Sequence, residues 1–215
     1  MRTTPVPLQM YHRLSLYLNY LKQDSLKDAP YISATAIANE LGLNDVLVRK
    51  DLAVAGKGGK PKIGYSRSEL IADIEMFLGY NDSFEAVLVG VGNLGKALLS
   101  HKGFEDCGLK IAVAFDSNPE LIGTQYKGKK ILSSAKISDL CKRLNISIGI
   151  LTVPAACAQE ACDALVEGGV RAVWNFTPAN LKTPESVSVK NEDMSASLAI
   201  LIKLLTENLE KREPD

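Results

Sequence analysis

The stretch Val87-Leu88-Val89-Gly90-Val91-Gly92-Asn93-Leu94-Gly95 decides how this chain folds. An apolar strand runs directly into a glycine turn and then into a helix, with the spacing G-x-G-x-x-G that is typical of dinucleotide-binding turns. Gly90 would allow the tight turn, Gly92 would let the backbone approach a pyrophosphate, and Gly95 would let the helix pack closely on the strand. The predicted phosphate-binding turn also includes Val91, Asn93 and Leu94. Because the motif alone is weak evidence for dinucleotide binding, the elements around it must show whether it belongs to a dinucleotide-binding fold.

A regular alternation of strands and helices follows this turn. We predict strands at 86–89, 110–115, 146–152 and 171–176, and helices at 93–101, near 135–144 and at 155–167. Continuous apolar strands that are separated by helices indicate a parallel sheet covered on both faces. The fold class is therefore α/β, with a Rossmann-type parallel sheet.

An acidic residue ends the second predicted strand. Asp116 lies 21 residues after Gly95, where a carboxylate would accept hydrogen bonds from the ribose hydroxyls of the adenosine. No arginine is adjacent to it, which favours NAD(H) over the 2′-phosphorylated cofactor. The alternative is a solvent-exposed acid in the turn before Pro119.

Two further strand ends point toward the same crevice, since ligands of open α/β sheets bind beyond the carboxyl ends of the strands. The first is Thr152-Val153-Pro154 and the second is Asn175-Phe176-Thr177-Pro178. Asn175 and Thr177 could hydrogen-bond a carboxamide, while Val153, Pro154 and Phe176 would form apolar walls for a nicotinamide ring. The alternative is that both are ordinary strand exits ended by a proline.

The N-terminal region has a different pattern. Apolar residues at helical spacing predict a first helix from about Met10 to Lys22, and Ser33 can cap a second helix that ends at Gly42. Asn44 can cap a third, whose inward face would be Val48, Leu52 and Ala55. Short helices around a glycine turn are typical of a helix-turn-helix.

A basic, glycine-rich segment at 56–65 follows the third helix and resembles the wing of a winged helix. The chain has 25 Lys and Arg and 25 Asp and Glu, yet six basic residues between Arg49 and Arg67 are accompanied only by Asp51. Such a cluster can bind an anionic polymer, so we predict double-stranded DNA as a partner. Arg49 would contact a base edge and Lys50 a phosphate, with the backbone or minor groove contacted by Lys57, Lys60 and Lys62. The alternative is a solvated lysine loop.

Ser66 and Glu69 have the spacing of a capping box before another helix that closes at Gly79. Its apolar side could pack on the winged domain or on a second subunit. We therefore predict a winged-helix domain at 1–80, a sheet domain at 81–190 and a C-terminal dimerisation helix at 191–215. The apolar stripe of that last helix, from about Met194 to Lys211, must be buried on its own domain or on a partner.

Several classes of protein are disfavoured by what the sequence lacks. No apolar run is long enough for a membrane span and the first residues lack a signal-peptide core, so we expect a cytoplasmic protein without a membrane partner. The four cysteines show neither a C-x-x-C pair nor a nearby histidine set, which predicts reduced thiols and no metal site. No catalytic Ser/His/Asp set is evident, and there is no room for a separate substrate domain. We therefore expect a sensor and not an enzyme.

The order of these parts resembles the Rex family of bacterial redox-sensing transcriptional repressors. The resemblance covers nearly the whole chain, and it is carried by these segments: 13–17 (RLSLY), 48–52 (VRKDL), 63–65 (IGY), 89–95 (VGVGNLG), 103–104 (GF), 114–116 (AFD), 151–155 (LTVPA), 175–178 (NFTP) and 191–193 (NED). It implies a homodimer with exchanged C-terminal helices that binds a palindromic operator in the apo or NAD⁺ state and is released by NADH. To the DNA-binding residues we add Arg13, Asn44 and Tyr65.

Some positions depart from the pattern of the family. The resemblance implies a switch in which Asp193 exchanges partners between an arginine of the first helix and a tyrosine, but Asn19 and His101 occupy those positions here. Met194 replaces the aromatic residue that the partner subunit would place beside the nicotinamide. Asp193 could instead pair with a protonated His101. Two alternatives remain: a Rex-like DNA-binding protein with a lost or retuned redox response, or a small NAD-dependent oxidoreductase or CoA-type ligand-binding subunit with an incidental basic loop.

Overall fold

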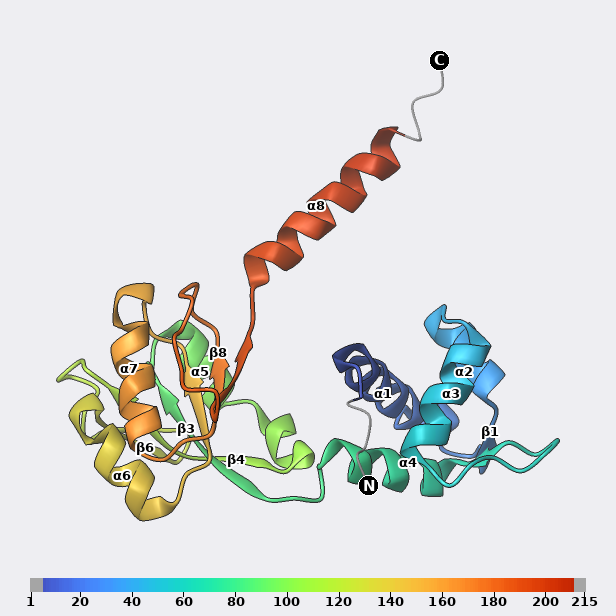
Figure 1. Cartoon of the computed structure of the whole chain (residues 1–215), viewed down its shortest axis with the longest axis horizontal. Helices are drawn as coiled ribbons and strands as arrows, with labels where there is room; N and C mark the ends of the chain where they lie inside the picture. The colour runs from blue at the N-terminus through green and yellow to red at the C-terminus, as the bar shows by residue number, and fades with distance from the viewer. Residues whose placement is uncertain (1–5, 211–215) are drawn as a thin grey trace. The chain divides into compact units, whose positions relative to one another are not determined.

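The computed structural model describes residues 6–210, and the chain divides into two compact units (Figure 1). The first unit extends to Asp82 and the second begins at Ser83. Each unit has its own apolar core, because the buried side chains form separate clusters on the two sides of that boundary.

Within its described residues, 6–82, the first unit contains four helices and a small two-stranded sheet. The helices are α1 (Leu8–Leu21), α2 (Ala34–Leu41), α3 (Asp45–Ala55) and α4 (Arg67–Leu78), with a 3₁₀ turn at Asp24–Leu26. The strands β1 (Tyr31–Ile32) and β2 (Tyr65–Ser66) pair antiparallel. The predicted turn between α2 and α3 is confirmed, because Gly42 has a φ of 64°, in the left-handed region that glycine enters without a steric penalty.

The core of this unit is made from one face of each helix. Val48, Leu52 and Ala55 of α3 are buried, as their spacing predicts. Leu70 and Ile74 of α4 join the same cluster, so α4 packs on the winged-helix unit itself. The predicted capping box at Ser66 is wrong, since Ser66 lies next to α4 without accepting a cap hydrogen bond. Its hydroxyl lies instead 3.4 Å from that of Ser68, while its backbone is paired in β2.

The second unit is built on a seven-stranded sheet with the order β5-β6-β4-β3-β7-β8-β9. The strands are β3 (Phe84–Val89), β4 (Leu109–Asp116), β5 (Gln125–Tyr126), β6 (Lys129–Ser133), β7 (Ile148–Leu151), β8 (Ala172–Asn175) and β9 (Ser188–Asn191). All neighbouring strands are parallel except β5 and β6. The predicted Rossmann-type sheet is confirmed, whereas the β5–β6 hairpin is an element that the sequence pattern did not reveal.

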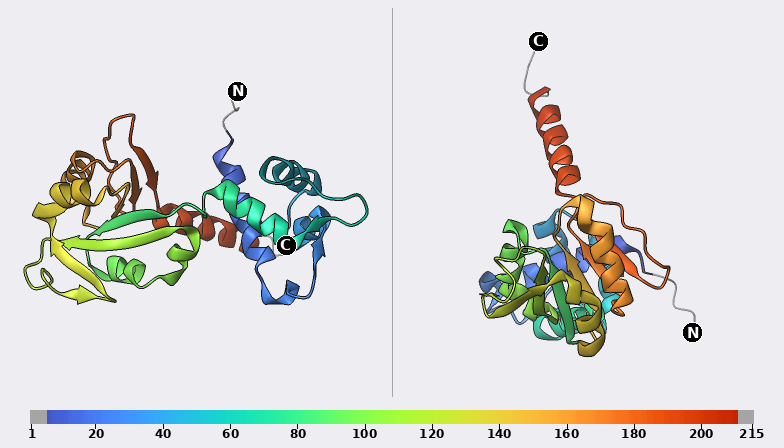
Figure 2. Two further views of the ribbon diagram at one scale, coloured as in Figure 1. Left: turned by 90° about the horizontal axis from the view of Figure 1, so that it is seen from below. Right: turned by 90° about the vertical axis from the view of Figure 1, so that its left-hand side faces the viewer.

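Helices cover both faces of this sheet (Figure 2). They are α5 (Asn93–Leu99), α6 (Ile137–Leu144) and α7 (Ala155–Glu167), with 3₁₀ segments at Lys102–Cys107 and Ser134–Lys136. Alternate residues of β3 face opposite sides, so that Val87 and Val89 pack with α6 and α7, whereas Ala86 and Leu88 pack on the face that carries Leu99 of α5. The strand order changes direction between β4 and β7, which places the carboxyl end of β3 at the topological switch point.

The described chain ends with α8 (Met194–Glu210), which follows β9. Its apolar side chains are exposed, including Leu198, Leu201, Ile202 and Leu205, each more than half accessible to solvent. Within residues 6–210, none of the helices combines the length and apolar character that a membrane crossing needs.

Candidate functional site

The glycine turn has the shape that its sequence predicts. Gly90 adopts a φ of 99°, which favours glycine over any residue with a side chain. A Cβ atom on Gly95 would collide with the carbonyl oxygen of Gly90, so the first turn of α5 can lie on the strand only because Gly95 has no side chain. A Cβ atom on Gly92 would meet no atom within 4 Å. Gly92 therefore leaves open space at the point where a pyrophosphate would approach.

Asp116 and Thr152 hold this turn from the two neighbouring strands. The backbone N–H of Val91 donates to Oδ2 of Asp116 at 2.6 Å, and that of Asn118 donates to Oδ1 at 2.8 Å. On the other side, Oγ1 of Thr152 donates to the carbonyl oxygen of Gly90 at 2.6 Å. The turn is thus fixed by protein contacts before a ligand arrives, and Thr152 supports the turn as well as lining the site.

A cavity of about 810 Å³ opens beside this turn, at the carboxyl ends of β3, β4 and β7. Of the predicted residues, those that line it are Gly90, Gly92, Asp116, Thr152, Val153 and Pro154. Val91, Asn93, Leu94 and Gly95 shape the turn without lining the cavity. Three serines on its wall, Ser117, Ser134 and Ser138, were not predicted from the sequence, because their positions depend on loop packing and carry no motif. Volume, hydroxyl groups and a carboxylate suit the adenosine end of a dinucleotide.

The structure assigns Asn175 a different task from the one predicted. Asn175 is fully buried, its Nδ2 donates to the carbonyl of Ala179 and to Oδ1 of Asn191, and its Oδ1 accepts from the backbone N–H and hydroxyl of Thr177. Every hydrogen-bonding position of the amide is used. Asn175 and Thr177 therefore hold the loop after β8 and, in this structure, do not present polar groups to a carboxamide.

A chain of aromatic rings lies next to this loop. Phe104 packs edge-on against His101 and against Trp174, with ring centroids 4.6 and 5.5 Å apart, and the ring centroids of Trp174 and Phe176 are 4.8 Å apart. The indole N–H of Trp174 donates to Oε1 of Glu192 at 2.9 Å. Phe176 also lines a second cavity of about 400 Å³ together with Asp193 and Met194. Phe176 thus lines a different cavity from Val153 and Pro154, with which the sequence predicted a common apolar wall.

The residues of the expected switch are exposed, or, in the case of Asp193, hydrogen-bonded within their own segment. The carboxylate of Asp193 accepts from the backbone N–H of Ala196, so it caps the start of α8. Met194 is 68% exposed, and Asn19 and His101 are also exposed. The pairing of Asp193 with His101 is absent from the described part of this chain. This cap forms because Asp193 lies immediately before α8, where backbone N–H groups have no helical partner.

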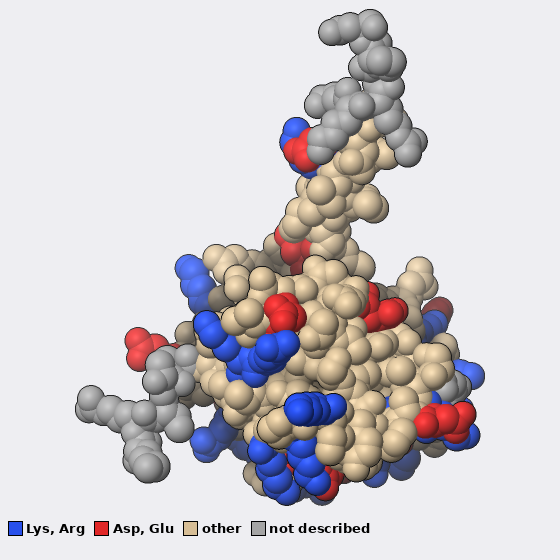
Figure 3. Space-filling model, turned by 90° about the vertical axis from the view of Figure 1, so that its right-hand side faces the viewer, with Lys and Arg blue, Asp and Glu red and all other residues tan. Residues whose placement is uncertain are grey.

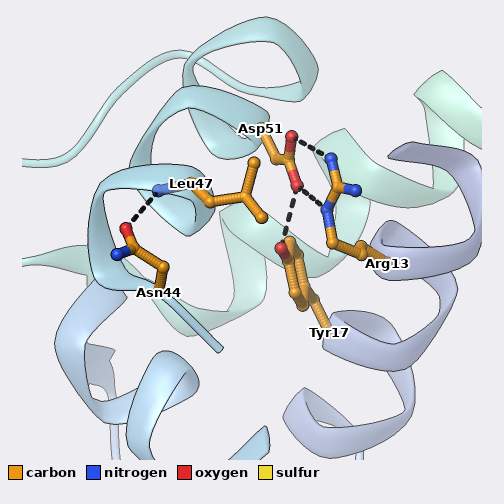
Figure 4. Close-up of polar contacts among 5 residues, drawn as sticks. All are labelled: Arg13, Tyr17, Asn44, Leu47 and Asp51. Carbon is orange, nitrogen blue, oxygen red and sulfur yellow. Dashed lines mark hydrogen bonds and ion pairs between the residues drawn. The ribbon is translucent and has the colours of Figure 1, made fainter. Parts of the chain in front are cut away.

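In the first unit, α3 has an anchored inner face and a basic outer face. Oδ1 of Asn44 accepts from the N–H groups of Val46 and Leu47, so Asn44 acts as the helix cap (Figure 4). Arg49 and Lys50 are exposed. Arg49 contacts Asp45 and Thr35 through Nη2, at 3.0 and 3.2 Å.

Arg13 is partly buried and pairs with the buried Asp51 instead of lying on the basic surface (Figure 4). Its Nε and Nη2 donate to the two carboxylate oxygens of Asp51 at 2.6 and 2.9 Å, and the hydroxyl of Tyr17 donates to the same carboxylate at 2.9 Å. Burial, followed by the bond to Asp51, raises the pKa of Tyr17 to about 12, and the bond to Asp51 raises the pKa of Arg13. The DNA-contacting position expected for Arg13 is thus replaced by a tie between α1 and α3.

The wing is an open loop. Lys60 and Gly64 form an isolated bridge, and the side chains of Lys57, Lys60 and Lys62 are exposed. Figure 3 faces this unit and shows Lys and Arg side chains gathered on its surface. Tyr65 instead packs on the core of the unit, where its ring approaches Gly59, so it supports the wing.

The cysteines of the described chain are unpaired, as expected. Cys141 and Cys162 are buried, and burial raises the pKa of both thiols, that of Cys141 to about 11. Such thiols are held in the unreactive, protonated form at neutral pH. No group of three or more His, Cys, Asp or Glu side chains within residues 6–210 is arranged to hold a metal ion.

Together, a winged helix-turn-helix and a Rossmann-type sheet with a dinucleotide turn define a class of nucleotide-responsive, DNA-binding regulators. Residues 5–53 match the family described as putative DNA-binding protein N-terminus, and residues 81–179 match the CoA binding domain family. The chain belongs to the Rex family of redox-sensing transcriptional repressors, as its resemblance predicted.

Similar proteins span this chain almost from end to end. The redox-sensing transcriptional repressor Rex of Porphyromonas gingivalis is 38% identical over an alignment that covers 92% of this chain and 91% of the relative. Rex of Treponema denticola is 42% identical, over 88% of this chain and 90% of the relative. Among solved structures, a repressor called RSP in complex with β-NAD⁺ and operator DNA has a TM-score of 0.89 at 32% identity, covering 98% of this chain and 97% of its own. RSP in complex with β-NADH has a TM-score of 0.86 at 32% identity, covering 98% and 99%. The relatives are thus named as regulators.

Proposed function

We propose that this protein is a DNA-binding transcriptional repressor that senses the NADH/NAD⁺ ratio. It binds a palindromic operator in the apo or NAD⁺ state and releases it when NADH binds. The observation that carries the proposal is the preformed glycine turn and its cavity, in the same chain as a basic recognition helix. A solved relative that was crystallised with both β-NAD⁺ and operator DNA supports it.

The sheet unit would bind NAD(H) at its adenosine end through the turn and Asp116. Gly92 would leave room for the pyrophosphate, and the carboxylate of Asp116 would accept from ribose hydroxyls while it holds the turn. The same negative charge would repel a 2′-phosphate. The nicotinamide end would lie toward Phe176 and Met194, where the second cavity opens.

The first unit would read the operator. Arg49 would donate to a base edge and Lys50 to a phosphate, while the wing lysines would follow the backbone or minor groove. Asn44, Arg13 and Tyr65 would contribute by holding α3 and the wing in position, through the cap, the ion pair and the ring packing described above.

A palindromic operator requires two copies of the chain, because each recognition helix reads one half-site. The exposed apolar side chains of α8 are the surface that a second copy would cover by exchanging this helix. We further propose that the protein acts in the cytoplasm, where the bacterial chromosome lies, and that it regulates without catalysing a reaction. The sequence shows no catalytic set to contradict this.

A second candidate is a relative that binds DNA with a retuned redox response. Asn19, His101 and Met194 occupy the positions of the expected switch, and Asp193 caps α8. A neutral asparagine cannot form the charge-assisted bond that an arginine would give to Asp193. Release by NADH would then depend on other contacts.

One titration separates these functions. Wild-type protein selects a palindromic duplex from a random-sequence pool, and fluorescence anisotropy then follows that labelled duplex as NADH or NAD⁺ is added. If the protein senses the redox state of the cofactor, the duplex should be released at a much lower concentration of NADH than of NAD⁺. Lys50→Ala should weaken DNA binding, whereas the control Lys110→Ala, at an exposed lysine of the sheet unit, should leave it unchanged.

Equal release by the two cofactors, or release by neither, would rule out the redox sensor and favour the retuned relative. Failure to select any duplex would reject DNA binding. Consumption of NADH with a carbonyl substrate, followed by its absorbance, would support the oxidoreductase.

A further inference from the structure

Arg49 is held by two side chains that no motif singles out. Its Nη2 lies 3.0 Å from Oδ2 of Asp45, the first residue of α3, and 3.2 Å from Oγ1 of Thr35 in the first turn of α2. The three residues therefore join the two helices of the helix-turn-helix on their outer surface. Nη2 is occupied by these contacts, while Nε and Nη1 keep three N–H hydrogens for other acceptors.

The neighbouring cations are not held in this way. The side chain of Lys50 has no ion pair or hydrogen bond among the contacts of residues 6–210, and neither do the side chains of Lys57, Lys60 and Lys62. These lysines can follow phosphates wherever they lie, because an ammonium group on a flexible chain acts as a mobile point charge. Arg49 differs from them because its Nη2 already contacts two side chains, those of Asp45 and Thr35, before DNA arrives.

Neither stability nor simple charge attraction accounts for the contacts of Arg49. The side chains of Arg49 and Asp45 are 58% and 41% exposed, and an ion pair that is so open to water contributes little to the folded state. A carboxylate on a surface that meets DNA also opposes binding, since it repels phosphates. What these contacts do provide is orientation, because a positioned guanidinium loses less rotational freedom when it donates to a base.

We infer that Thr35 and Asp45 are specificity-determining positioning residues that aim Arg49 at a base edge of the operator. This inference rests on the proposed function. Nη1 and Nε of the held fork would donate to acceptors such as O6 and N7 of guanine. The carboxylate of Asp45 repels the phosphates of any duplex, so it also weakens binding to DNA that lacks the correct base. Thr35 and Asp45 thus raise the ratio of specific to non-specific affinity without touching the cofactor site.

The test measures two affinities for each variant at one fixed salt concentration: for the selected operator and for a scrambled duplex of the same length. Asp45→Ala should bind the scrambled duplex more tightly, because a negative charge is lost, while the ratio of operator to scrambled affinity falls about tenfold. Thr35→Val should lower the ratio in the same direction by a smaller factor.

Conservative variants supply the controls. Asp45→Asn and Thr35→Ser keep an oxygen acceptor for Nη2 and should restore most of the ratio. In an Arg49→Ala background, Asp45→Ala should leave the ratio unchanged, because no guanidinium remains to be positioned.

If Asp45→Ala weakened both duplexes by the same factor, Asp45 would have a merely structural role and the inference would be overturned. An unchanged ratio, or a loss that persists without Arg49, would overturn it as well. Failure of the wild-type protein to bind any duplex would instead reject the proposed function, so the two failures are distinguishable.

Discussion

The chain contains two glycine-rich loops, and Gly95 in the turn and Gly58 in the wing serve opposite purposes. In the turn at 90–95, removal of a side chain lets backbone approach backbone, as the contact between the Cβ position of Gly95 and the carbonyl of Gly90 shows. In the wing, Gly58 has a φ of 86° and no atom within 4 Å of its Cβ position. Gly58 therefore supplies an unusual backbone conformation in open solvent, whereas Gly64 at the base of the wing approaches the carbonyl oxygen of Ile32 much as Gly95 approaches that of Gly90.

The hydrogen bonds of the two loops differ in the same way. The turn is tied to both neighbouring strands, through Asp116 and Thr152, whereas the wing is closed by backbone bonds between Lys60 and Gly64. A tied turn suits a ligand of fixed geometry, since its donors are already in place. An open basic loop suits a polymer that it meets at varying positions along the phosphate chain. Of these two loops, the one that is tied on both sides is thus the one that would meet the small ligand.

Gly95→Ala should have the largest effect. The added methyl group would push α5 away from the carbonyl of Gly90, which should lower the free energy of unfolding by about 2 kcal/mol or more. NADH binding should weaken with it. Thermal unfolding and NADH fluorescence titration measure the two effects.

Gly92→Ala is the matched control, because its Cβ would meet only open space. Its unfolding free energy should stay within about 0.5 kcal/mol of wild type, while NADH affinity falls because the methyl group blocks the pyrophosphate. Equal stability of both variants would contradict the tied turn.

Asp116→Ala should have the next largest effect. Two backbone N–H groups lose their acceptor, which should cost about 1–2 kcal/mol of stability, and the preference for NADH over NADPH should shrink. Glu120→Ala, which removes a carboxylate from an exposed position nearby, should change neither quantity. A denaturation curve measures the loss of stability, and titrations with NADH and NADPH measure the preference. An unaltered preference would show that Asp116 does not contact the ribose.

Gly58→Ala should have a smaller effect. A non-glycine residue in the left-handed region costs about 1–2 kcal/mol locally, but the wing carries little of the core, so the melting temperature should hardly move. Operator affinity should fall modestly as the loop changes shape. A large loss of thermal stability would mean that the wing is tied as firmly as the turn.

Lys60→Ala should leave stability unchanged and act only through charge. We expect the slope of log affinity for the operator against log salt concentration to fall by about one unit, with little change in sequence preference. Anisotropy titrations at several salt concentrations measure this slope. A changed preference among operator variants would assign Lys60 a base contact instead.

The sequence predicted most of the fold because local patterns determine it. The helix ends at Ser33, Gly42 and Asn44 and the tight turn at Gly90 follow from caps and backbone conformation, which are properties of a few adjacent residues. The β5–β6 hairpin was missed because its strands are short and lack a clear apolar alternation.

The parts of the site that were missed depend on distant pairs. Arg13 and Asp51 are 38 residues apart, so nothing in the sequence shows that one neutralises the other inside the unit. Asn175 was read as a ligand-binding amide because its strand end points to the crevice, yet its partner Asn191 is 16 residues away. Surface lysines were easier to place, since exposure needs no partner.

Trp174 gives the protein an optical reporter of its own. It is the single tryptophan of the chain, and its indole is hydrogen-bonded to Glu192, two residues before α8, and packed on Phe176 at the wall of the second cavity. Because the reduced nicotinamide absorbs light in the range where indole emits, bound NADH would accept excitation energy from Trp174 whereas NAD⁺ would not. The two redox forms of the cofactor could therefore be told apart from the emission of unlabelled protein.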